Sequence, residues 1–368
     1  MRLDALSLYD FRNYERLSLN PHPGVNLIVG ENAQGKTNLL ESVFYLSTGR
    51  SFRTTHPAEL VRFGADFCDM QCGLFSQGRQ QSIRAVVFSS RRPRQLYLGG
   101  VKQKSAAELP GVLTTVLFCP DDLQLLKGGA QARRRLLDTA LCQLRPQYAQ
   151  ALAEYTRLCE SKARILKDHG QYPSLLEPLP EYNRRMAQVG AVLIWHRARY
   201  LDKLERCAAE FHRAFSGEKE SFSVRYKTVS TVKDAFCDKA ALEQALCEHQ
   251  KTHQRAELES GQVLSGPHRD DFEAELDGLS IKSFGSQGQT RTAAISLKLA
   301  ERELFRQDTG EEPVLLLDDV LSELDGRRQD FVLNQIRTGQ VFITCCEPEK
   351  LTNIGRTFAV ENGRISCI

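Results

Sequence analysis

Long apolar runs are missing from this sequence of 368 residues, and none approaches the roughly 18 residues that a membrane-spanning helix requires. The first residues, MRLDALSLYDFRNY, also lack the basic region and the apolar core of a signal peptide. These absences argue against a membrane-embedded protein and against a secreted one. We therefore expect a cytoplasmic location.

Paired cysteine spacings are also missing. The chain has 11 cysteines, but they are scattered singly apart from Cys345 and Cys346, and no two have the CxxC spacing typical of a zinc site. A cytoplasmic chain does not need a disulfide framework. We expect reduced, mostly buried thiols.

A large excess of charge of one sign is absent as well, because the net charge is only +3. The distribution of charge is more informative than the total. No acidic residue lies between Asp69 and Glu108, while seven cations do, so this basic stretch has a local charge of +7. The basic stretch predicts either contact with a polyanion such as DNA or a solvated β surface.

The hydrophobic pattern alternates between β-rich and helical regions. The first 20 residues and residues 67–118 show strand periodicity, and a helical pattern with two long helices, joined by a proline-containing loop, follows from about Asp121. Strand patterns return from Phe272. The helices form either an arm or a packed core face, and both interpretations require a helical subdomain.

The strongest motif is GENAQGKT, which fits G-x-x-x-x-G-K-[ST] between a buried strand, Val25 to Gly30, and a helix from Lys36. The glycines let consecutive backbone N–H groups face a triphosphate, Lys36 would reach its β and γ phosphates, and Thr37 would give a hydroxyl to Mg²⁺. A chance Gly-Lys-Thr turn is the alternative. We expect ATP to bind at Gly30, Glu31, Asn32, Ala33, Gln34, Gly35, Lys36, Thr37 and Asn38.

A second apolar strand, VLLL, ends in two carboxylates and predicts the other half of a nucleotide site. Asp318 is the candidate magnesium ligand, and Asp319 is the candidate group that orients the attacking water. Adjacent carboxylates at a strand end can also be simple solvated residues. Lys36 and Asp318 are 282 positions apart (318 minus 36), so we expect a large insertion between the two halves.

The segment FGSQGQTRT lies between the predicted arm and Asp318 and resembles the signature loop of ABC ATPases. A serine hydroxyl and a glycine N–H at the start of a helix suit a γ-phosphate, although such a run is also an ordinary polar loop. The matching residues are Ser286, Gly288 and Gln289. LSELD, after Asp319, is similar to the D-loop of the same superfamily or is an ordinary turn with helix caps.

Over nearly its whole length, the chain resembles the RecF family, whose members are relatives of the SMC proteins. Seven segments carry this resemblance, in the order DFRNY, GENAQGKTNLLE, GRSFRT, FCPDDLQLLKG with RRRLLD, SGPHRDDF, FGSQGQTRT and LLLDDVLSELD. The resemblance implies an α/β fold: an ABC-type P-loop ATPase head of mixed sheets and helices, with an inserted helical arm. We expect head segments at 1–118 and 259–368 and the arm at 119–258.

The resemblance also implies activity and partners: a weak DNA-dependent ATPase in recombinational repair, which dimerises on ATP, binds double-stranded and gapped DNA, works with RecO and RecR, and associates with the nucleoid. Arg12 and Asn13 would lie near the nucleotide. Arg53 would couple DNA binding to hydrolysis, or brace a loop. Together with the basic stretch, this gives the candidate DNA contacts Arg53, Arg91, Arg92 and Arg94. Arg133 to Arg135 would bind an anion or form structural salt bridges.

Two departures from transporter-type ATPases stand out. No clean Q-loop glutamine or switch histidine is present; Gln124 and Thr344 are the nearest substitutes, and His268 lies elsewhere in the order of motifs. These departures disfavour the alternative of a transporter ATPase. Arm helices of about 30 residues, about 45 Å long at ~1.5 Å per residue, disfavour the other alternative, an SMC-like DNA tether.

Overall fold

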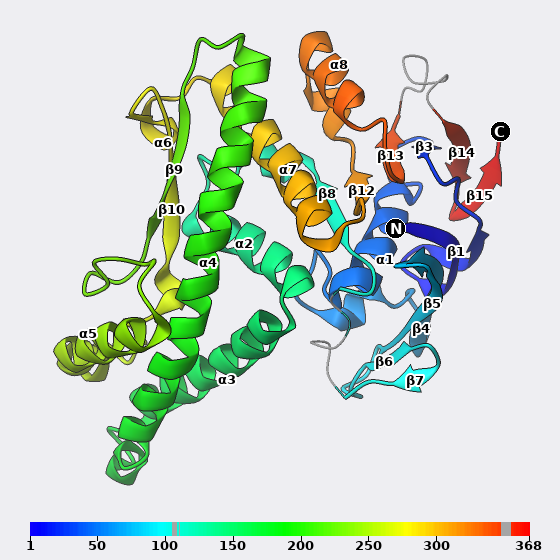
Figure 1. Ribbon diagram of the computed structural model, residues 1–368. Coiled ribbons are helices and arrows are strands. Elements are labelled where there is room, and N and C mark those ends of the chain that lie inside the picture. Colours follow the sequence, from blue (N-terminus) through cyan, green and yellow to red (C-terminus); the bar gives the residue numbers. More distant parts are fainter. Residues whose placement is uncertain (105–108, 110, 347–354) are drawn as a thin grey trace. The chain divides into compact units, whose positions relative to one another are not determined.

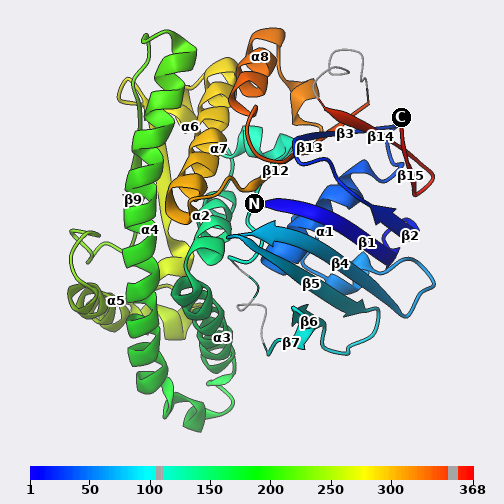
Figure 2. The same cartoon turned by 45° about the vertical axis from the view of Figure 1, so that its right-hand side comes forward.

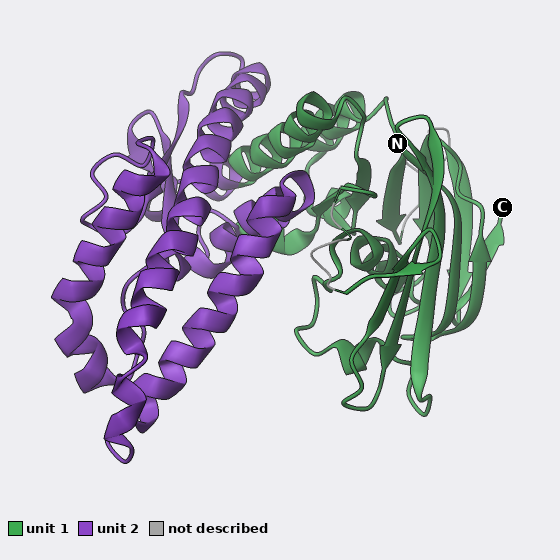
Figure 3. Ribbon diagram, turned by 60° about the horizontal axis from the view of Figure 1, so that its bottom comes forward, with its two compact units in different colours: residues 1–124, 291–368 green, residues 125–290 purple. Residues whose placement is uncertain are grey.

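The computed structural model describes residues 1–104, 109, 111–346 and 355–368. The chain forms two compact units (Figure 3): a head unit of residues 1–124 and 291–368, and a helical unit of residues 125–290. We had expected the helical part to end at residue 258. Residues 259–290 belong to the helical unit instead, because strand β10 (Asp271–Leu276) in this segment pairs with β9 (Phe222–Lys227).

The first sheet of the head unit has the strand order β15-β14-β3-β13-β12-β8 (Figure 1). Strands β3, β8, β12, β13 and β14 run parallel, and β15 pairs antiparallel with β14. The inner strands are nearly continuous apolar runs, as expected for strands covered on both faces. The bounds are β3 Val25–Val29, β8 Thr115–Phe118, β12 Val314–Leu317, β13 Val341–Cys345, β14 Arg356–Glu361 and β15 Arg364–Cys367.

The second sheet of the head unit is antiparallel, in the order β2-β1-β4-β5-β6-β7. Its strands alternate buried and exposed side chains, so one face packs on the core. One core cluster combines this face with helix α1 (Lys36–Thr48) and the inner strands of the first sheet (Figure 2). The bounds are β1 Arg2–Phe11, β2 Tyr14–Leu19, β4 Phe67–Ser76, β5 Arg79–Phe88, β6 Gln95–Leu98 and β7 Val101–Lys102.

The remaining elements of the head unit are short, apart from α7, which runs over residues 287–309 and so begins in the helical unit. The strand patterns predicted for the first 20 residues, for VLLL and for the described part of residues 67–118 are confirmed; residues 105–108 and 110 lie outside the described residues. The remaining bounds are η1 Pro57–Leu60, η3 Pro120–Gln124, α7 Gln287–Thr309, η6 Val320–Glu323 and α8 Gly326–Gln335.

The helical unit is built around helix α4 (Leu179–Ser216), whose 38 residues give it a length of about 57 Å at ~1.5 Å per residue. Helix α3 (Pro146–Asp168) packs along it and is joined to it through η4 (Pro173–Leu176). Helix α5 (Lys239–Ser260) packs on α4 as well. The apolar stripe of α4 is therefore a packed core face. The other elements are α2 (Ala130–Leu144), η5 (Pro267–Arg269), β11 (Leu279–Ser280) and α6 (Ile281–Phe284).

Buried ion pairs hold the SGPHRDDF segment inside the helical unit. Arg197 of α4, 2% exposed, donates to Asp270 at 2.9 Å and to the Pro267 carbonyl at 2.6 Å. Arg133 donates to Asp271 from two nitrogens, at 2.6 and 2.9 Å. Such a charged network, built from several paired groups, fixes the geometry of the elements that supply it. Of the two roles considered for Arg133, the structure has the salt bridge.

All 11 cysteines are free, and fewer than half of them are buried, which differs from the mostly buried thiols that we expect. Four are buried, five are partly buried, and Cys346 and Cys367 are exposed. Among the described residues, no group of three or more His, Cys, Asp or Glu side chains is arranged to hold a metal ion. Likewise, none of the described helices has the length and apolarity to cross a membrane.

Candidate nucleotide-binding site

The loop of residues 30–35 joins β3 to α1 and depends on glycine at both ends. Gly30 has φ +153°, and a Cβ there would lie 2.4 Å from the Val360 carbonyl oxygen. Gly35 has φ +121°, and its Cβ would lie 2.7 Å from the Asn13 side chain. Both the backbone conformation and the close approach exclude a side chain. The loop therefore presents backbone groups at the N-terminus of α1, which favours an anion.

Lys36 lies across this loop with only 4% of its surface exposed. Its Nζ donates to the carbonyl oxygens of Gly30 at 2.8 Å and Glu31 at 3.0 Å, and it lies 3.3 Å from Cys346 Sγ. These partners are two carbonyls and a thiol, and none is a carboxylate. The ammonium group is thus held in place with its charge uncompensated by these contacts, as a phosphate-binding lysine requires. The sulfur of Cys346, which sequence reasoning did not assign to the site, also contacts Asn32 Oδ1 at 3.1 Å.

Thr37, in the first turn of α1, and Asp318, just after β12, meet because the strands that precede them, β3 and β12, are both neighbours of β13 in one parallel sheet. Thr37 Oγ1 donates to Asp318 Oδ1 at 2.8 Å, and Thr344 Oγ1 donates to the same oxygen at 3.0 Å. Burial raises the pKa of Asp318, while the two hydroxyl bonds lower it. A hydroxyl and a carboxylate oxygen at this distance are hard oxygen ligands, which fits Mg²⁺.

Asp319 follows with a left-handed backbone, φ 48°, an uncommon conformation for a residue with a side chain. Its N–H donates to Thr344 Oγ1 at 2.8 Å. Thr344 therefore contacts both acidic residues through one hydroxyl. The strained conformation is held by the surrounding strand ends, a feature that clusters at functional sites.

Two arginines beside the loop share one buried carboxylate, Glu41 of α1. Arg12 donates to both oxygens of Glu41, at 2.9 and 2.8 Å, and Arg53 lies 3.5 Å from it. Ser51 donates to the same carboxylate at 2.5 Å, and Glu41 is fully buried. Sequence reasoning missed Glu41. The signal that would have found it is an acidic residue within the apolar run of α1, near two arginine-bearing motifs.

Asn13 and Asn38 connect this cluster to the loop. Asn13 donates to the Gln34 carbonyl at 2.7 Å, and Asn38 donates to Asn13 at 2.8 Å. Arg53 in turn donates to Asn38 Oδ1 at 2.5 Å. The structure therefore brings Arg12, Asn13 and Arg53 together at the edge of the P-loop.

The signature-like residues lie in the helical unit, at the start of α7. Ser286 Oγ accepts from Gln289 N at 3.2 Å, and Gln289 Oε1 accepts from Ser286 N at 3.0 Å. This reciprocal pair is a capping box, the serine-x-x-glutamine arrangement that begins helices. Gly288 lies within this first turn, so the loop presents backbone and hydroxyl groups at a helix N-terminus.

The other sequence candidates lie apart from this geometry. Gln124 is an exposed residue of η3. His268 lies in the helical unit, where its Nδ1 is 3.0 Å from the Tyr155 hydroxyl and its Nε2 is 3.1 Å from the Val263 carbonyl. Burial lowers its pKa. His268 therefore braces the helical unit.

The three candidate DNA-contact arginines of the basic stretch differ in their surroundings. Arg91 and Arg92 are exposed, and the Arg92 guanidinium lies 5.9 Å from the Phe88 ring centroid. Arg94 is partly buried and donates to the Gly49 carbonyl and, at 3.1 Å, to Tyr45 Oη. Its guanidinium is thus engaged within the head unit.

Three features together define an ABC-type P-loop ATPase head. They are a P-loop after a buried strand, an acidic pair at the end of another parallel strand of the same sheet, and a large helical insertion. A family model described as the RecF/RecN/SMC N terminal domain matches residues 2–366. The chain belongs to this family, and within it to RecF: the DNA replication and repair protein RecF of Staphylococcus aureus strain JH9 is 37% identical over 372 residues, which cover 99% of this chain and 100% of that protein.

Solved structures also show the similarity of this chain to RecF. The recombination mediator protein RecF, solved as RecF-ATPrS in the RecFOR pathway, has 31% identity and a TM-score of 0.93, covering 100% of this chain and 98% of that one. The same mediator solved as RecF-ATP has 31% identity and a TM-score of 0.91, covering 100% and 97%. The Smc head domain of Pyrococcus furiosus, at 16% identity and a TM-score of 0.56 over 100% and 95% of the two chains, shows the shared head fold alone.

Proposed function

We propose that this chain is an ATP-dependent DNA-repair protein whose ATP-bound form dimerises on double-stranded or gapped DNA and whose slow hydrolysis of ATP resets it. The observation that carries the proposal is the hydrogen-bonded set of Thr37, Thr344 and Asp318 next to the buried ammonium of Lys36. The names of the relatives support the same conclusion, since they are a DNA replication and repair protein and a recombination mediator solved with ATP.

Each residue of the site would have a separate role in binding ATP and Mg²⁺. Residues 30–38 surround the phosphates with backbone N–H groups, and Lys36 binds the β and γ phosphates. Thr37 and Asp318 hold Mg²⁺, which supplies charge neutralisation on the phosphates when bound. Asp319 orients the attacking water from the end of β12, where its backbone has an uncommon left-handed conformation. Arg12 and Asn13 contact the nucleotide from the loop edge.

The signature residues would act on a second copy of the chain. Ser286, Gly288 and Gln289 present a hydroxyl, an N–H group and an amide at the N-terminus of α7, where an anion is favoured. In the proposed dimer these groups bind the γ-phosphate held by the P-loop of the partner. ATP therefore joins two heads.

DNA contacts are assigned to Arg53, Arg91 and Arg92, with RecO and RecR as protein partners. Exposed guanidinium groups bind phosphate without sequence readout. Arg91 and Arg92 keep their exposed positions, whereas Arg94 has the head-unit partners described above, so we give Arg94 a positioning role in this surface.

Replacing the P-loop lysine tests the proposal. Lys36→Ala should abolish binding of a fluorescent ATP analogue, because the loop loses the cation that binds the β and γ phosphates. The matched control is Lys102→Ala, an exposed lysine of the same unit, which should bind the analogue with wild-type affinity. Equal affinity of Lys36→Ala and wild type, measured by titration, would refute this nucleotide site.

A further inference from the structure

The first turn of α7 has a side-chain partner outside its own capping box. Gln289 Nε2 donates to Glu220 Oε1 at 2.8 Å. Glu220 lies on the short connection between α4 and β9, so the contact links two elements that are 69 residues apart in sequence. The other oxygen of Glu220 lies 2.9 Å from His212 Nε2, and His212 is a fully buried residue of α4.

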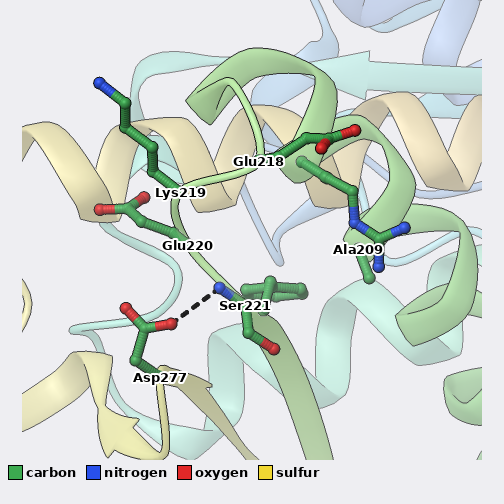
Figure 4. Close-up of a pocket in the computed structure, with 8 residues that line it drawn as sticks. Ala209, Glu218, Lys219, Glu220, Ser221 and Asp277 are labelled. Carbon is green, nitrogen blue, oxygen red and sulfur yellow. Dashed lines mark hydrogen bonds between the residues drawn. The ribbon is translucent and has the colours of Figure 1, made fainter.

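The connection that carries Glu220 is held at both ends. It begins at Gly217, the left-handed C-cap of α4. It ends at Ser221, whose N–H donates to Asp277 Oδ1 at 2.9 Å while its carbonyl accepts from the Asp277 N–H at 2.9 Å. Figure 4 shows Glu220 between Lys219 and Ser221, among the residues that line a pocket. The volume of this pocket is about 260 Å³. Glu220 is thus positioned before any ligand arrives.

The carboxylate determines which way the Gln289 amide faces. An amide has a donor end and an acceptor end, whereas an ionised carboxylate only accepts hydrogen bonds. Glu220 therefore requires the NH₂ group on its own side, which leaves Gln289 Oε1 to accept from Ser286 N. A flipped amide would place two acceptors against each other at Glu220 and two donors against each other at Ser286.

His212 fixes the other side of the carboxylate. Its ring stacks on Phe222 with centroids 5.5 Å apart and planes at 27°. Because this ring is fully buried on α4, the Glu220 carboxylate is tied to the long helix as well as to the signature loop. The chain of contacts runs from His212 through Glu220 and Gln289 to Ser286.

We propose that Glu220 is a positioning residue for the signature loop: it orients the Gln289 amide, and so the Ser286 turn, for the phosphate of a partner copy, and it ties this loop to helix α4. The inference rests on the proposed ATP-dependent dimer. It adds a residue that touches no nucleotide and acts through Gln289.

The test separates nucleotide binding from dimerisation. Glu220→Gln keeps the shape of the side chain. Because the introduced amide can either donate or accept a hydrogen bond, it no longer holds the Gln289 amide in one orientation. We expect unchanged affinity for a fluorescent ATP analogue at low protein concentration, because the P-loop is untouched. We also expect about a tenfold rise in the ATP concentration needed for dimerisation by light scattering, since a hydrogen bond to a charged group is lost. Glu218→Gln, an exposed carboxylate lining the same pocket, is the matched control and should behave as wild type.

A conservative variant guards against a purely structural effect. Glu220→Asp keeps an acceptor-only carboxylate and should dimerise at ATP concentrations closer to wild type than Glu220→Gln does. Thermal unfolding of each variant, followed by the fluorescence of Trp195, checks the fold. If Glu220→Gln does not fold, Glu220→Ala, which removes the acceptor, is compared with Glu218→Ala instead; a selective dimerisation defect in the former supports the proposal, and wild-type dimerisation of both overturns it.

The outcomes are distinct. Dimerisation of Glu220→Gln at wild-type ATP concentrations would overturn the role of Glu220 and leave the proposed function intact. Equal losses in Glu220→Gln and Glu220→Asp would also overturn it, because charge and acceptor character would then not matter. Failure of the wild-type protein itself to dimerise with ATP would refute the proposed function and this role together.

Discussion

Lys36, Thr37 and Asp318 were predicted as site residues from local sequence, the first two from the P-loop pattern and the third from an apolar strand that ends in carboxylates. The structure brings Thr37 Oγ1 to 2.8 Å from Asp318 Oδ1, and the roles of these residues in binding ATP and Mg²⁺ stay predictions. Glu41 was not found, because its importance comes from two arginines that reach it from separate segments. A partnership of that kind depends on the fold and is invisible to local patterns.

The basic stretch makes a second residue-scale point, since charge alone did not distinguish three neighbouring arginines. Arg94 donates to the Gly49 carbonyl and to Tyr45, whereas Arg91 and Arg92 are exposed. We predict that Arg94→Ala lowers the free energy of unfolding by about 1–3 kcal/mol, the cost of leaving its partners unsatisfied. Urea unfolding measures this change.

The control for Arg94→Ala is a double variant in which the exposed Arg91 and Arg92 are both replaced by glutamate. Arg91→Glu with Arg92→Glu should leave the free energy of unfolding within about 0.5 kcal/mol of wild type. It should also weaken duplex DNA binding and flatten the dependence of affinity on salt, because fewer phosphates are neutralised. An unchanged salt dependence, measured by fluorescence anisotropy, would remove these two residues from the DNA surface.

At the scale of elements, periodicity predicted the strands of both head-unit sheets and the two long helices, because each rests on a pattern of 2.0 or 3.6 residues. The boundary of the helical unit was misplaced, since β10 pairs with a strand whose partner residues are 44 or more positions earlier. Local pattern does not encode such pairing. The spacing of Ser286 and Gln289 is typical of a capping box, whereas no local pattern indicates the hydrogen bond from Gln289 to Glu220.

Helix α4 also carries a titratable group that makes the helical unit sensitive to acid. Burial, with the nearby charges of Lys239, Arg145 and Arg199, lowers the pKa of His196 from 6.5 to about 4. The unfolded chain therefore binds a proton at a higher pH than the folded one does. The stability contributed by neutral His196 is complete above pH 6.5 and is lost as the pH falls toward 4.

We predict that the thermal midpoint of the helical unit decreases as the pH is lowered from 6.5 to 4. In His196→Phe this decrease should be smaller than in wild type. The single tryptophan of the chain, Trp195, is the neighbour of His196, with ring centroids 4.9 Å apart, so its fluorescence reports the transition. His169→Gln, at the end of α3, is the control and should keep the wild-type slope. A His196→Phe slope identical to wild type would contradict the assignment.

At the scale of the whole molecule, both halves of the P-loop site lie in the head unit, while the signature-like residues lie in the helical unit. The membership of the chain in the RecF family was predicted from seven motifs in order, and the matches to RecF over nearly the whole chain confirm it. Helix α4 is longer than the 30 residues expected, but at about 57 Å it remains one helix of a packed unit. A packed unit of this length argues against a long-range tether.

The most direct test of the central claim is sedimentation velocity of the protein with and without Mg-ATP, in the absence and presence of gapped DNA. The wild-type protein should sediment as a monomer without nucleotide and as a dimer with Mg-ATP, and the dimer should sediment with the DNA. Asp319→Asn should retain the dimer for longer than wild type, because the group that orients the attacking water is lost. A protein that binds ATP but remains a monomer under all of these conditions would contradict the account.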